Sequence, residues 1–314
     1  MPLAAIGALW FALALDRAFG EPPARWHPVV WMGRYLELAG RRVAPAAAGQ
    51  RAWPFAAGAL AWCLGAVVVG ALAWALQSFA ATLPAWAAAL LLGLALKPLL
   101  AWRVLRDEVQ AVETALAGSL DAGRAQLARL VSRDVAALDA SGVRESAIES
   151  LAENLNDSLV APLFWFVLLG LPGAAVYRFA NTADAMWGYH GERGGRDWTW
   201  AGKWAARADD LLSWPGARLT AGLLALAALR WPRGLRREAR RTPSPNGGWP
   251  MAAMALLLGV RLRKPGIYAL HAEGRPPAPA DTRQALRWSG AAVLAASVLA
   301  SAALVAMGGS VHGG

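Results

Sequence analysis

Three carboxylates recur at four-residue intervals immediately before a long apolar run. Glu149, Glu153 and Asp157 lie in the segment ESLAENLND, which leads directly into sequence of membrane-like hydrophobicity. At about 100° per residue, a helix brings the three acids onto one narrow arc and sets Leu151 and Leu155 on the opposite arc. The spacing therefore predicts an amphipathic helix with an acidic stripe.

Two interpretations of this stripe are open. An ordinary solvated helix face is one of them. However, ionisable groups near membrane depth are costly and usually have a partner, and no basic residue lies between Arg144 and Arg178. Carboxylate oxygens are ligands that suit Mg²⁺. A metal ion or a distant arginine is therefore the sharper hypothesis.

Further downstream, two polar clusters could also carry chemistry. Asp184 follows Asn181 by three residues, on nearly the same helical face. It is either part of a polar helix end or a ligand for metal or substrate. Arg207, Asp209 and Asp210 form a second cluster, for which a salt-bridged surface helix is an equally good interpretation.

Two loop-like stretches complete the candidates. The segment SPNGGWP at 244–250 contains Asn246 and combines proline, which fixes φ, with glycines that let backbone donors approach a ligand. A simple linker is the alternative, and no G-x-x-x-x-G-K-[ST] motif occurs in the chain. His27 follows the stretch LDRAFGEPP and could be structural on its own.

The composition favours lipid as the solvent of this chain. Its 314 residues are 57% hydrophobic and 17% charged, with a mean hydropathy of +0.35, whereas soluble domains carry about 25% charged residues. The net charge of +10 comes mainly from arginines in loops, which is typical of cytoplasmic loops, and no nucleic-acid-binding module is present. The single cysteine excludes an intrachain disulfide.

The elements that must position these residues are helices of one polytopic membrane domain covering 1–314. Segments 54–79, 85–105 and 286–307 are long enough to span about 30 Å of hydrocarbon. Segments 3–15, 159–179 and 213–231 are ambiguous, because they are short or interrupted by proline and glycine. The predicted fold is all-α: a helical bundle with re-entrant or broken helices.

The basic residues indicate the orientation of the chain. If 159–179 and 213–231 are both re-entrant or buried in protein, residues 106–285 all face the cytoplasm. This region holds amphipathic helices predicted at 107–116 and 120–130, and a basic interfacial helix at 230–241. Residues 3–15 lack the flanks of a cleaved signal peptide. The expected location is the bacterial cytoplasmic membrane, with the active site facing the cytoplasm.

Taken in order along the chain, these motifs resemble one family. The series is LDRAFGEPP, HPVV, GR, SRDV, ESLAENLNDSLVAPLF, YRFANTADAMWGY, ARADD and SPNGGWP. It is similar to the adenosylcobinamide-phosphate synthase family of cobalamin biosynthesis, the CobD/CbiB family, from about residue 15 to 270. The chain has Glu21 where the family often has aspartate, and lacks one residue between Trp214 and Pro215.

The resemblance implies an integral membrane enzyme that acts late in corrinoid assembly. It would join the propionate carboxylate of adenosylcobyric acid to the amine of (R)-1-aminopropan-2-ol phosphate, or a close aminoalcohol. The reaction implied uses ATP and Mg²⁺ and proceeds through an acyl phosphate. Expected partners are the corrinoid, the aminoalcohol phosphate, the nucleotide and membrane lipid, with no nucleic acid. A homo-oligomer or association with other enzymes of the pathway is left open.

The resemblance also suggests roles for the candidate residues, because phosphoryl transfer needs cations that spread charge. Glu149, Glu153, Asp157 and Asp184 are assigned to the metal and nucleotide side. The candidates for phosphate or substrate contacts are His27, Arg34, Arg133, Asn154, Asn181, Arg193, Arg207 and Asn246.

A non-catalytic corrinoid-binding scaffold or a transporter is the competing hypothesis. Acidic residues at membrane depth and broken helices also occur in transporters. The sequence has no visible pair of inverted halves, which favours the enzyme.

Overall fold

The polypeptide folds almost entirely into helices, which confirms the predicted all-α class. The computed structural model describes residues 2–46, 49 and 51–310. Long helices follow the apolar segments because backbone groups must be hydrogen-bonded internally where water is absent. The strands within the described residues form two antiparallel hairpins: β1 (Glu192–Arg193) with β2 (Arg196–Asp197), and β3 (Leu262–Lys264) with β4 (Tyr268–Leu270).

Five helical segments of the described chain are long and apolar enough to cross a membrane. They are Pro2–Phe19, Ala52–Ala80, Ala85–Gly118, Ala140–Trp187 and Pro279–Gly308. The spans predicted at 54–79, 85–105 and 286–307 fall on three of them. The ambiguous segments 3–15 and 159–179 fall on the other two, whereas 213–231 lies outside all five. The number of true crossings, like the single-domain organisation, stays a prediction.

The chain forms two compact units. The first unit is Met1–Leu100, Ala161–Ser213 and Ala300–Gly314. Its helices are α1 (Pro2–Phe19), α2 (Pro28–Val43), α3 (Ala52–Ala80), α4 (Ala85–Leu96) and α8 (Ala161–Trp187), with 3-10 turns at Ala24–Trp26 and Lys97–Leu99.

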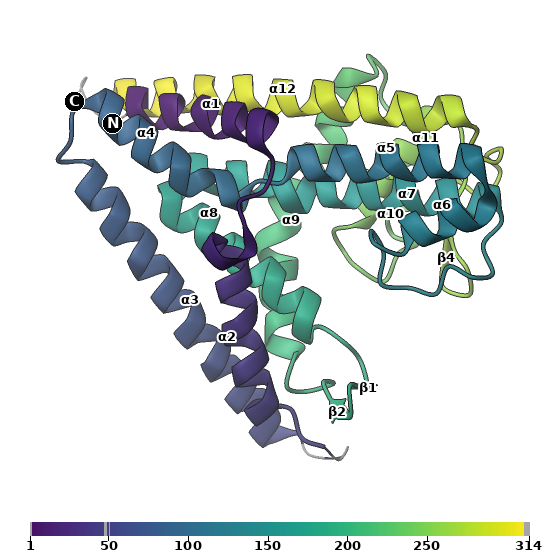
Figure 1. Cartoon of the computed structure of the whole chain (residues 1–314), viewed down its shortest axis with the longest axis horizontal. Coiled ribbons are helices and arrows are strands. Elements are labelled where there is room, and N and C mark those ends of the chain that lie inside the picture. The colour runs from purple at the N-terminus through teal and green to yellow at the C-terminus, as the bar shows by residue number, and fades with distance from the viewer. Residues whose placement is uncertain (1, 47–48, 50, 311–314) are drawn as a thin grey trace. The chain divides into compact units, whose positions relative to one another are not determined.

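Small residues bring α1 and α4 close together in the first unit, where the two helices lie side by side (Figure 1). Ala8 and Ala12 of α1 and Ala88 and Gly93 of α4 are buried. Close approach of backbones through small side chains is the usual way in which helices associate in lipid.

Helix α8 is broken where the sequence predicted a break. Gly170 has a φ of 69°, so α8 is interrupted there, two residues before Pro172. The amide of Leu171 is freed by this break and donates to Oε1 of Gln77 on α3 at 2.7 Å. A polar side chain of a neighbouring helix thus satisfies the backbone at the break.

The second unit is Ala101–Val160 and Trp214–Leu299. It contains α5 (Trp102–Gly118), α6 (Leu120–Leu127), α7 (Ala140–Leu155), α10 (Leu235–Ala239), α11 (Gly248–Leu258) and the hairpin β3–β4. Helices α9 (Lys203–Ala227) and α12 (Pro279–Ser310) contribute residues to both units. Helix α7 packs against α5, α6, α11 and β3 and is therefore central to this unit.

Two predicted helices differ from the structure. The basic run 230–241 forms a helix only over Leu235–Ala239, because Pro232 disfavours a helix through it and Gly234 adopts a φ of 80°. The acidic stripe does not lie on an amphipathic helix. Residues 145–152 of α7 are buried on every side, and the α-helical geometry gives way to a π-helical turn at Asn156–Val160.

Candidate functional site

A small polar cavity lies in the second unit, beside the acidic face of α7. Its volume is about 170 Å³, and its walls come from the loop before α7, from α7 itself and from the end of β3. The lining residues are Leu130, Val131, Ser132, Arg133, Glu149, Ser150, Glu153, Asn154 and Lys264. The cavity thus brings together four residues predicted from the sequence: Arg133, Glu149, Glu153 and Asn154.

Arg133 and Glu149 form a buried ion pair in this cavity. Nη2 of Arg133 donates to Oε1 of Glu149 at 3.0 Å, and the two side chains are 17% and 7% exposed. The distant arginine considered for the acidic stripe is therefore present. Nη1 of Arg133 and Oε2 of Glu149 are buried and have no hydrogen-bond partner among the described residues. Such groups are costly unless a ligand or water completes them.

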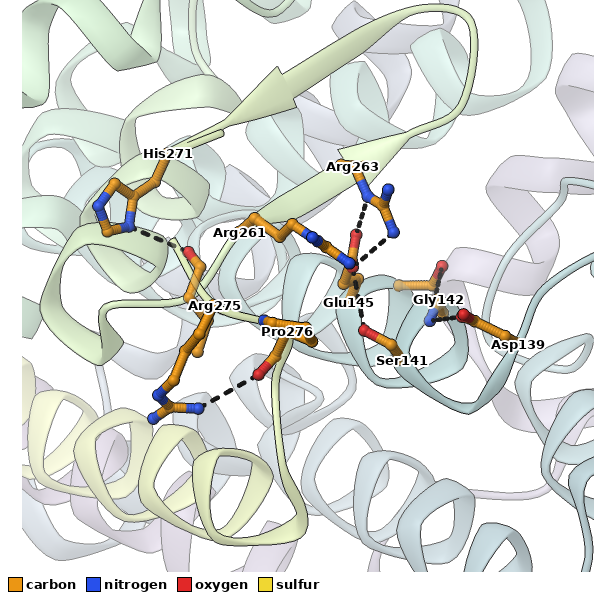
Figure 2. Close-up of polar contacts among 11 residues, drawn as sticks. Asp139, Ser141, Gly142, Glu145, Arg261, Arg263, His271, Arg275 and Pro276 are labelled. Atoms are coloured by element: carbon orange, nitrogen blue, oxygen red, sulfur yellow. Dashed lines mark hydrogen bonds and ion pairs between the residues drawn. The ribbon is translucent and has the colours of Figure 1, made fainter. Parts of the chain in front are cut away.

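The hairpin β3–β4 places a second cation at the cavity. Glu145, which is 1% exposed, accepts hydrogen bonds from Nε of Arg261 at 3.3 Å and from Nε and Nη2 of Arg263 at 2.9 and 3.0 Å (Figure 2). This ion cluster ties β3 to α7. Lys264 follows Arg263 directly, so the same contacts hold Lys264 beside Glu149 and Glu153.

Tyr268 of β4 also lies near the acidic groups. Burial, followed by the negative charge of Glu149, raises the pKa of the Tyr268 phenol above its ordinary value. The hydroxyl group therefore stays protonated at neutral pH and lies 3.8 Å from the sulfur of Met251. A neutral phenol beside a carboxylate can donate a hydrogen bond but cannot act as a base.

The glycine-rich loop before α11 approaches the same carboxylates. Oγ of Ser244 accepts from the amides of Asn246 and Gly247, both at 3.2 Å, and so shapes the turn. A Cβ atom at Gly247 would lie 2.7 Å from Oε1 of Glu153, so only glycine fits this position without displacing the carboxylate. Gly247 therefore lies directly against the Glu153 carboxylate, and the approach of the loop's backbone donors to a ligand stays a prediction.

Asp157 and Asn246 take part in side-chain hydrogen bonds near the π-helical turn. Asn156 donates from Nδ2 to Oδ1 of Asp157 at 2.7 Å and accepts from Oγ1 of Thr220 at 3.3 Å. Asn246 accepts from Nη1 of Arg218. π-Helical turns inside helices are frequent at functional sites. Neither Asp157 nor Asn246 lines the cavity described above.

His27 belongs to a buried polar cluster of the first unit. Its Nε2 lies 2.7 Å from Oε2 of Glu21, and its Nδ1 accepts from the amide of Val29 at the start of α2. Nζ of Lys97 lies 3.1 Å from Glu21 and 3.6 Å from Oδ1 of Asp16. Lys97 is thus directed at carboxylates of the protein and is buried.

The cluster also perturbs the ionisation of Glu21. Burial alone opposes the charged form, but the hydrogen bond with His27 and the charge of Lys97 outweigh it and lower the pKa of Glu21. Because His27 is engaged with Glu21 and with the backbone, its contacts in the structure are those of a structural residue. Arg34, further along α2, is exposed.

The remaining predicted residues also lie in the first unit. Asn181 accepts from Nη1 of Arg178 at 3.2 Å, and Asp184 is half-buried near the end of α8. Arg193 stacks on the ring of Tyr189 at 3.8 Å, and Arg207 is exposed on α9. The predicted residues thus divide between the two units.

Within the described residues, no group of three or more His, Cys, Asp or Glu side chains is arranged as a metal site. Two carboxylates, those of Glu149 and Glu153, nevertheless line one cavity, and one oxygen of Glu149 has no hydrogen-bond partner in the part of the chain that the structure describes. Mg²⁺ is commonly bound by one or two carboxylates together with substrate phosphates and water. The donor set therefore fits Mg²⁺ bound together with a phosphate ligand.

Comparison with known proteins supports the resemblance noted in the sequence. The profile of the family described as CobD/Cbib protein matches residues 9–307. The chain belongs to the CobD/Cbib family. Family membership, together with the five long apolar helices found in the described part of the chain, indicates a membrane protein. No solved structure is significantly similar to this CobD/Cbib family member.

Several curated relatives cover most of the chain. "Probable cobalamin biosynthesis protein CobD" of Methanothermobacter thermautotrophicus is 36% identical, over 84% of this chain and 86% of its own length. "Cobalamin biosynthesis protein CobD" of Chromobacterium violaceum is 40% identical, over 85% and 84%, and that of Brucella suis is 36% identical, over 93% and 95%.

Sequence reasoning missed three polar cavity residues of this family member, Ser132, Ser150 and Lys264. Ser132 begins the SRDV motif, and its neighbour Arg133 was the residue selected. Lys264 is the last residue of the basic run RLRK that follows α11. Nothing in this run indicates which acidic residues Lys264 approaches in the folded chain. The signal that could have found it is the turn Lys264-Pro265-Gly266, which predicts a hairpin.

Proposed function

We propose that this protein acts in cobalamin biosynthesis as an enzyme that joins a corrinoid carboxylate to an aminoalcohol phosphate at the expense of ATP. Family membership supports the pathway. The observation that carries the reaction is the polar cavity in which Arg133 and Lys264 face Glu149 and Glu153. A site that combines cations and carboxylates in this way suits phosphoryl transfer.

The proposed reaction has two steps. The propionate oxygen of adenosylcobyric acid attacks the γ-phosphorus of ATP, so that an acyl phosphate forms and ADP leaves. The amine of aminopropanol phosphate then attacks the acyl carbon, an amide forms, inorganic phosphate leaves and the amine loses a proton. Both steps move a phosphoryl group or phosphate whose charge must be stabilised.

The described residues provide that stabilisation. Nη1 of Arg133 is buried and has no hydrogen-bond partner in residues 2–46, 49 and 51–310, so it can donate to a phosphate oxygen without breaking the pair with Glu149. Lys264 adds a second positive charge on the same cavity wall. Charge-assisted hydrogen bonds of this kind are stronger than neutral ones, particularly where water is excluded.

Glu149 and Glu153 are the residues that would hold Mg²⁺. When bound, the ion would supply positive charge to nucleotide phosphate oxygens. Gly247 keeps the space beside Glu153 free of a side chain, and the half-buried Asn154 contributes a neutral polar group to the cavity wall. The roles of Asp157, Asp184, Arg193 and Arg207 as nucleotide or phosphate contacts remain part of the proposal.

The size of the cavity limits what it can hold. At about 170 Å³ it is smaller than the roughly 300–1,000 Å³ of sites for drug-sized ligands. It can take the reacting phosphoryl group and the end of the propionate chain, but not a corrinoid ring. We therefore assign the cavity to the reacting groups and leave the ring outside it.

Product formation with purified protein is the decisive test. The protein is incubated with adenosylcobyric acid, aminopropanol phosphate, ATP and Mg²⁺, and the amide and ADP are measured by chromatography. We expect one ADP per amide, no product without ATP, and loss of product in Glu153→Gln but not in Glu37→Gln, an exposed control on α2. Corrinoid binding without an ATP-dependent product would favour a scaffold or transporter.

Labelling tests the proposed cytoplasmic orientation of this site in the bacterial cytoplasmic membrane. Cysteines are introduced by Glu192→Cys and Arg236→Cys in a chain that carries Cys63→Ser. We expect both to react only with membrane-permeant thiol reagents in intact cells. Labelling of either position by an impermeant reagent would contradict the orientation.

A further inference from the structure

A second, larger polar pocket lies in the second unit, away from the acidic cavity. Its volume is about 600 Å³, and it is lined by residues of α5, α7 and the first turns of α12. Those used below are Glu113, Arg144, Thr282, Arg283 and Arg287. None of them is assigned to the proposed reaction.

Glu113 and Arg144, which both line this pocket, form an ion pair. Nε of Arg144 donates to both carboxylate oxygens of Glu113 at 3.0 Å, and Nη2 donates to Oε1 at 2.9 Å. Oγ1 of Thr282 donates to Oε2 of Glu113 at 2.8 Å. Glu113 is the only carboxylate among the residues that line the pocket, and both of its oxygens already accept hydrogen bonds from Arg144.

Two further arginines therefore lack a counter-charge. Arg283 and Arg287 are exposed on successive turns of α12, and neither has an ion-pair partner among the described residues. Like charges four residues apart on a helix repel each other. Three arginines against one glutamate leave the pocket with two positive charges. The pocket is therefore complementary to an anion.

The sequence around the pocket places it at the boundary of an apolar region. Arg287 immediately precedes Trp288 and the apolar stretch of α12, and Trp102 begins α5. Trp102 lies near Gly290, because a Cβ atom there would be 3.7 Å from its ring. Tryptophans concentrate at membrane–water interfaces. At 1.5 Å per residue, Arg287 and Arg283 lie only about 5 and 10 Å along the helix from Gly290.

We propose that this pocket binds the phosphate headgroup of an anionic membrane lipid. The free guanidinium groups of Arg283 and Arg287 contact the phosphate, while the acyl chains follow the apolar part of α12. Basic pockets between helices at the cytoplasmic boundary are suited to such headgroups. The Glu113–Arg144 pair fixes the relative position of α5 and α7, and Thr282 fixes α12 against them.

Position favours a lipid over a soluble phosphate. Both charges lie within the first turns of α12, directly before its apolar stretch, and arginines at the end of an apolar helix extend towards the membrane–water interface. A lipid held at this point would fasten α12 to α5 and α7. The inference does not depend on the proposed reaction, because it can be tested by binding alone.

The test measures lipid binding to purified full-length protein in a zwitterionic detergent. Phosphatidylglycerol or phosphatidylcholine is titrated, and bound lipid is counted by native mass spectrometry. We expect wild type to prefer phosphatidylglycerol and Arg283→Gln/Arg287→Gln to bind it about thirtyfold more weakly, which corresponds to about 1 kcal/mol per arginine near a membrane surface. Arg41→Gln/Arg42→Gln, a basic pair on α2 outside the pocket, should bind as wild type does.

Two additional arms keep the result unambiguous. Arg283→Lys/Arg287→Lys retains the charge and should retain most of the binding, while circular dichroism shows whether each variant is folded. Equal binding of both lipids, or unchanged phosphatidylglycerol binding in the glutamine variant, would overturn the proposal. Displacement of the lipid by millimolar inorganic phosphate would identify a site for soluble anions instead.

Discussion

Removing Arg133 alone should destabilise the protein more than removing Arg133 and Glu149 together. In the wild type these side chains are 17% and 7% exposed and form a hydrogen bond of 3.0 Å. Arg133→Gln leaves the Glu149 carboxylate buried without its ion-pair partner. Loss of one member of a buried ion pair costs about 3–5 kcal/mol.

The double variant defines the expected magnitude. In Arg133→Gln/Glu149→Gln, two neutral amides replace the charges, and neither buried charge remains uncompensated. Replacing a buried ion pair by neutral groups often leaves stability unchanged, so we expect the unfolding free energy of the double variant to be within about 1–2 kcal/mol of the wild-type value. Because each single variant should cost about 3–5 kcal/mol and the double variant about 1–2 kcal/mol, the interaction energy should be at least about 4 kcal/mol, above the usual range of about 0.5–3 kcal/mol for residues in contact.

The free energies can be measured by unfolding the detergent-solubilised protein with sodium dodecyl sulfate, with helix content followed by circular dichroism. Glu37→Gln/Arg41→Gln serves as a control, because this pair is 57% and 67% exposed. Its interaction energy should be below about 1 kcal/mol. If the effects of Arg133→Gln and Glu149→Gln simply add, the two residues do not form the buried pair on which the site is built.

Three further predictions test the supports of the site and the buried cluster of the first unit. Glu145→Gln removes the carboxylate that holds Arg263, so Lys264 is displaced and kcat/KM for ATP should fall by about tenfold to a hundredfold in the ligase assay. Gly247→Ala places a methyl group 2.7 Å from the Glu153 carboxylate and should reduce ligase activity by about a hundredfold. Glu21, whose pKa is lowered, contributes stability that is present above its unfolded-state pKa and lost as pH falls through its folded-state value. The difference in unfolding free energy between wild type and Glu21→Gln should therefore shrink on acidification.

Each of these has its own control. Gly222→Ala meets nothing within 4 Å and should leave activity unchanged; a similar loss there would point to a general effect of added methyl groups. Retention of full activity in Glu145→Gln would show that the hairpin does not need this contact. If the difference in unfolding free energy between wild type and Glu21→Gln grows at low pH, the pKa of Glu21 is not lowered in the folded protein.

Much of the fold could be predicted because it depends on local sequence. Apolar segment length predicts helices in lipid, where no other local backbone arrangement satisfies its hydrogen bonds. Gly170 and Pro172 predicted the break in α8, because one permits positive φ and the other lacks an amide hydrogen. The prediction of one helix over the basic run 230–241 was wrong. Its charge pattern suggested a continuous helix, but Pro232 and Gly234 restrict the helix to Leu235–Ala239.

The candidate site was only partly predictable, because its members come from segments distant in sequence. Helical periodicity placed Glu149 and Glu153 on one face of α7, and motif order pointed to Arg133 and Asn246. Periodicity could not supply Lys264, whose neighbour Arg263 pairs with Glu145 at a separation of 118 residues. Pairing over such a distance depends on how β3 packs on α7, which no local pattern contains.

The sequence by itself determined that this chain is helical, suited to a membrane, and marked by an acidic stripe in a recognisable order of motifs. Only the tertiary structure decided that Glu149 of this stripe is buried, that Arg133 is its partner, and that its second carboxylate oxygen has no hydrogen-bond partner within the described part of the chain. The physical reason is that helical phase follows from neighbouring residues, whereas burial and charge pairing depend on which distant segments pack around a helix.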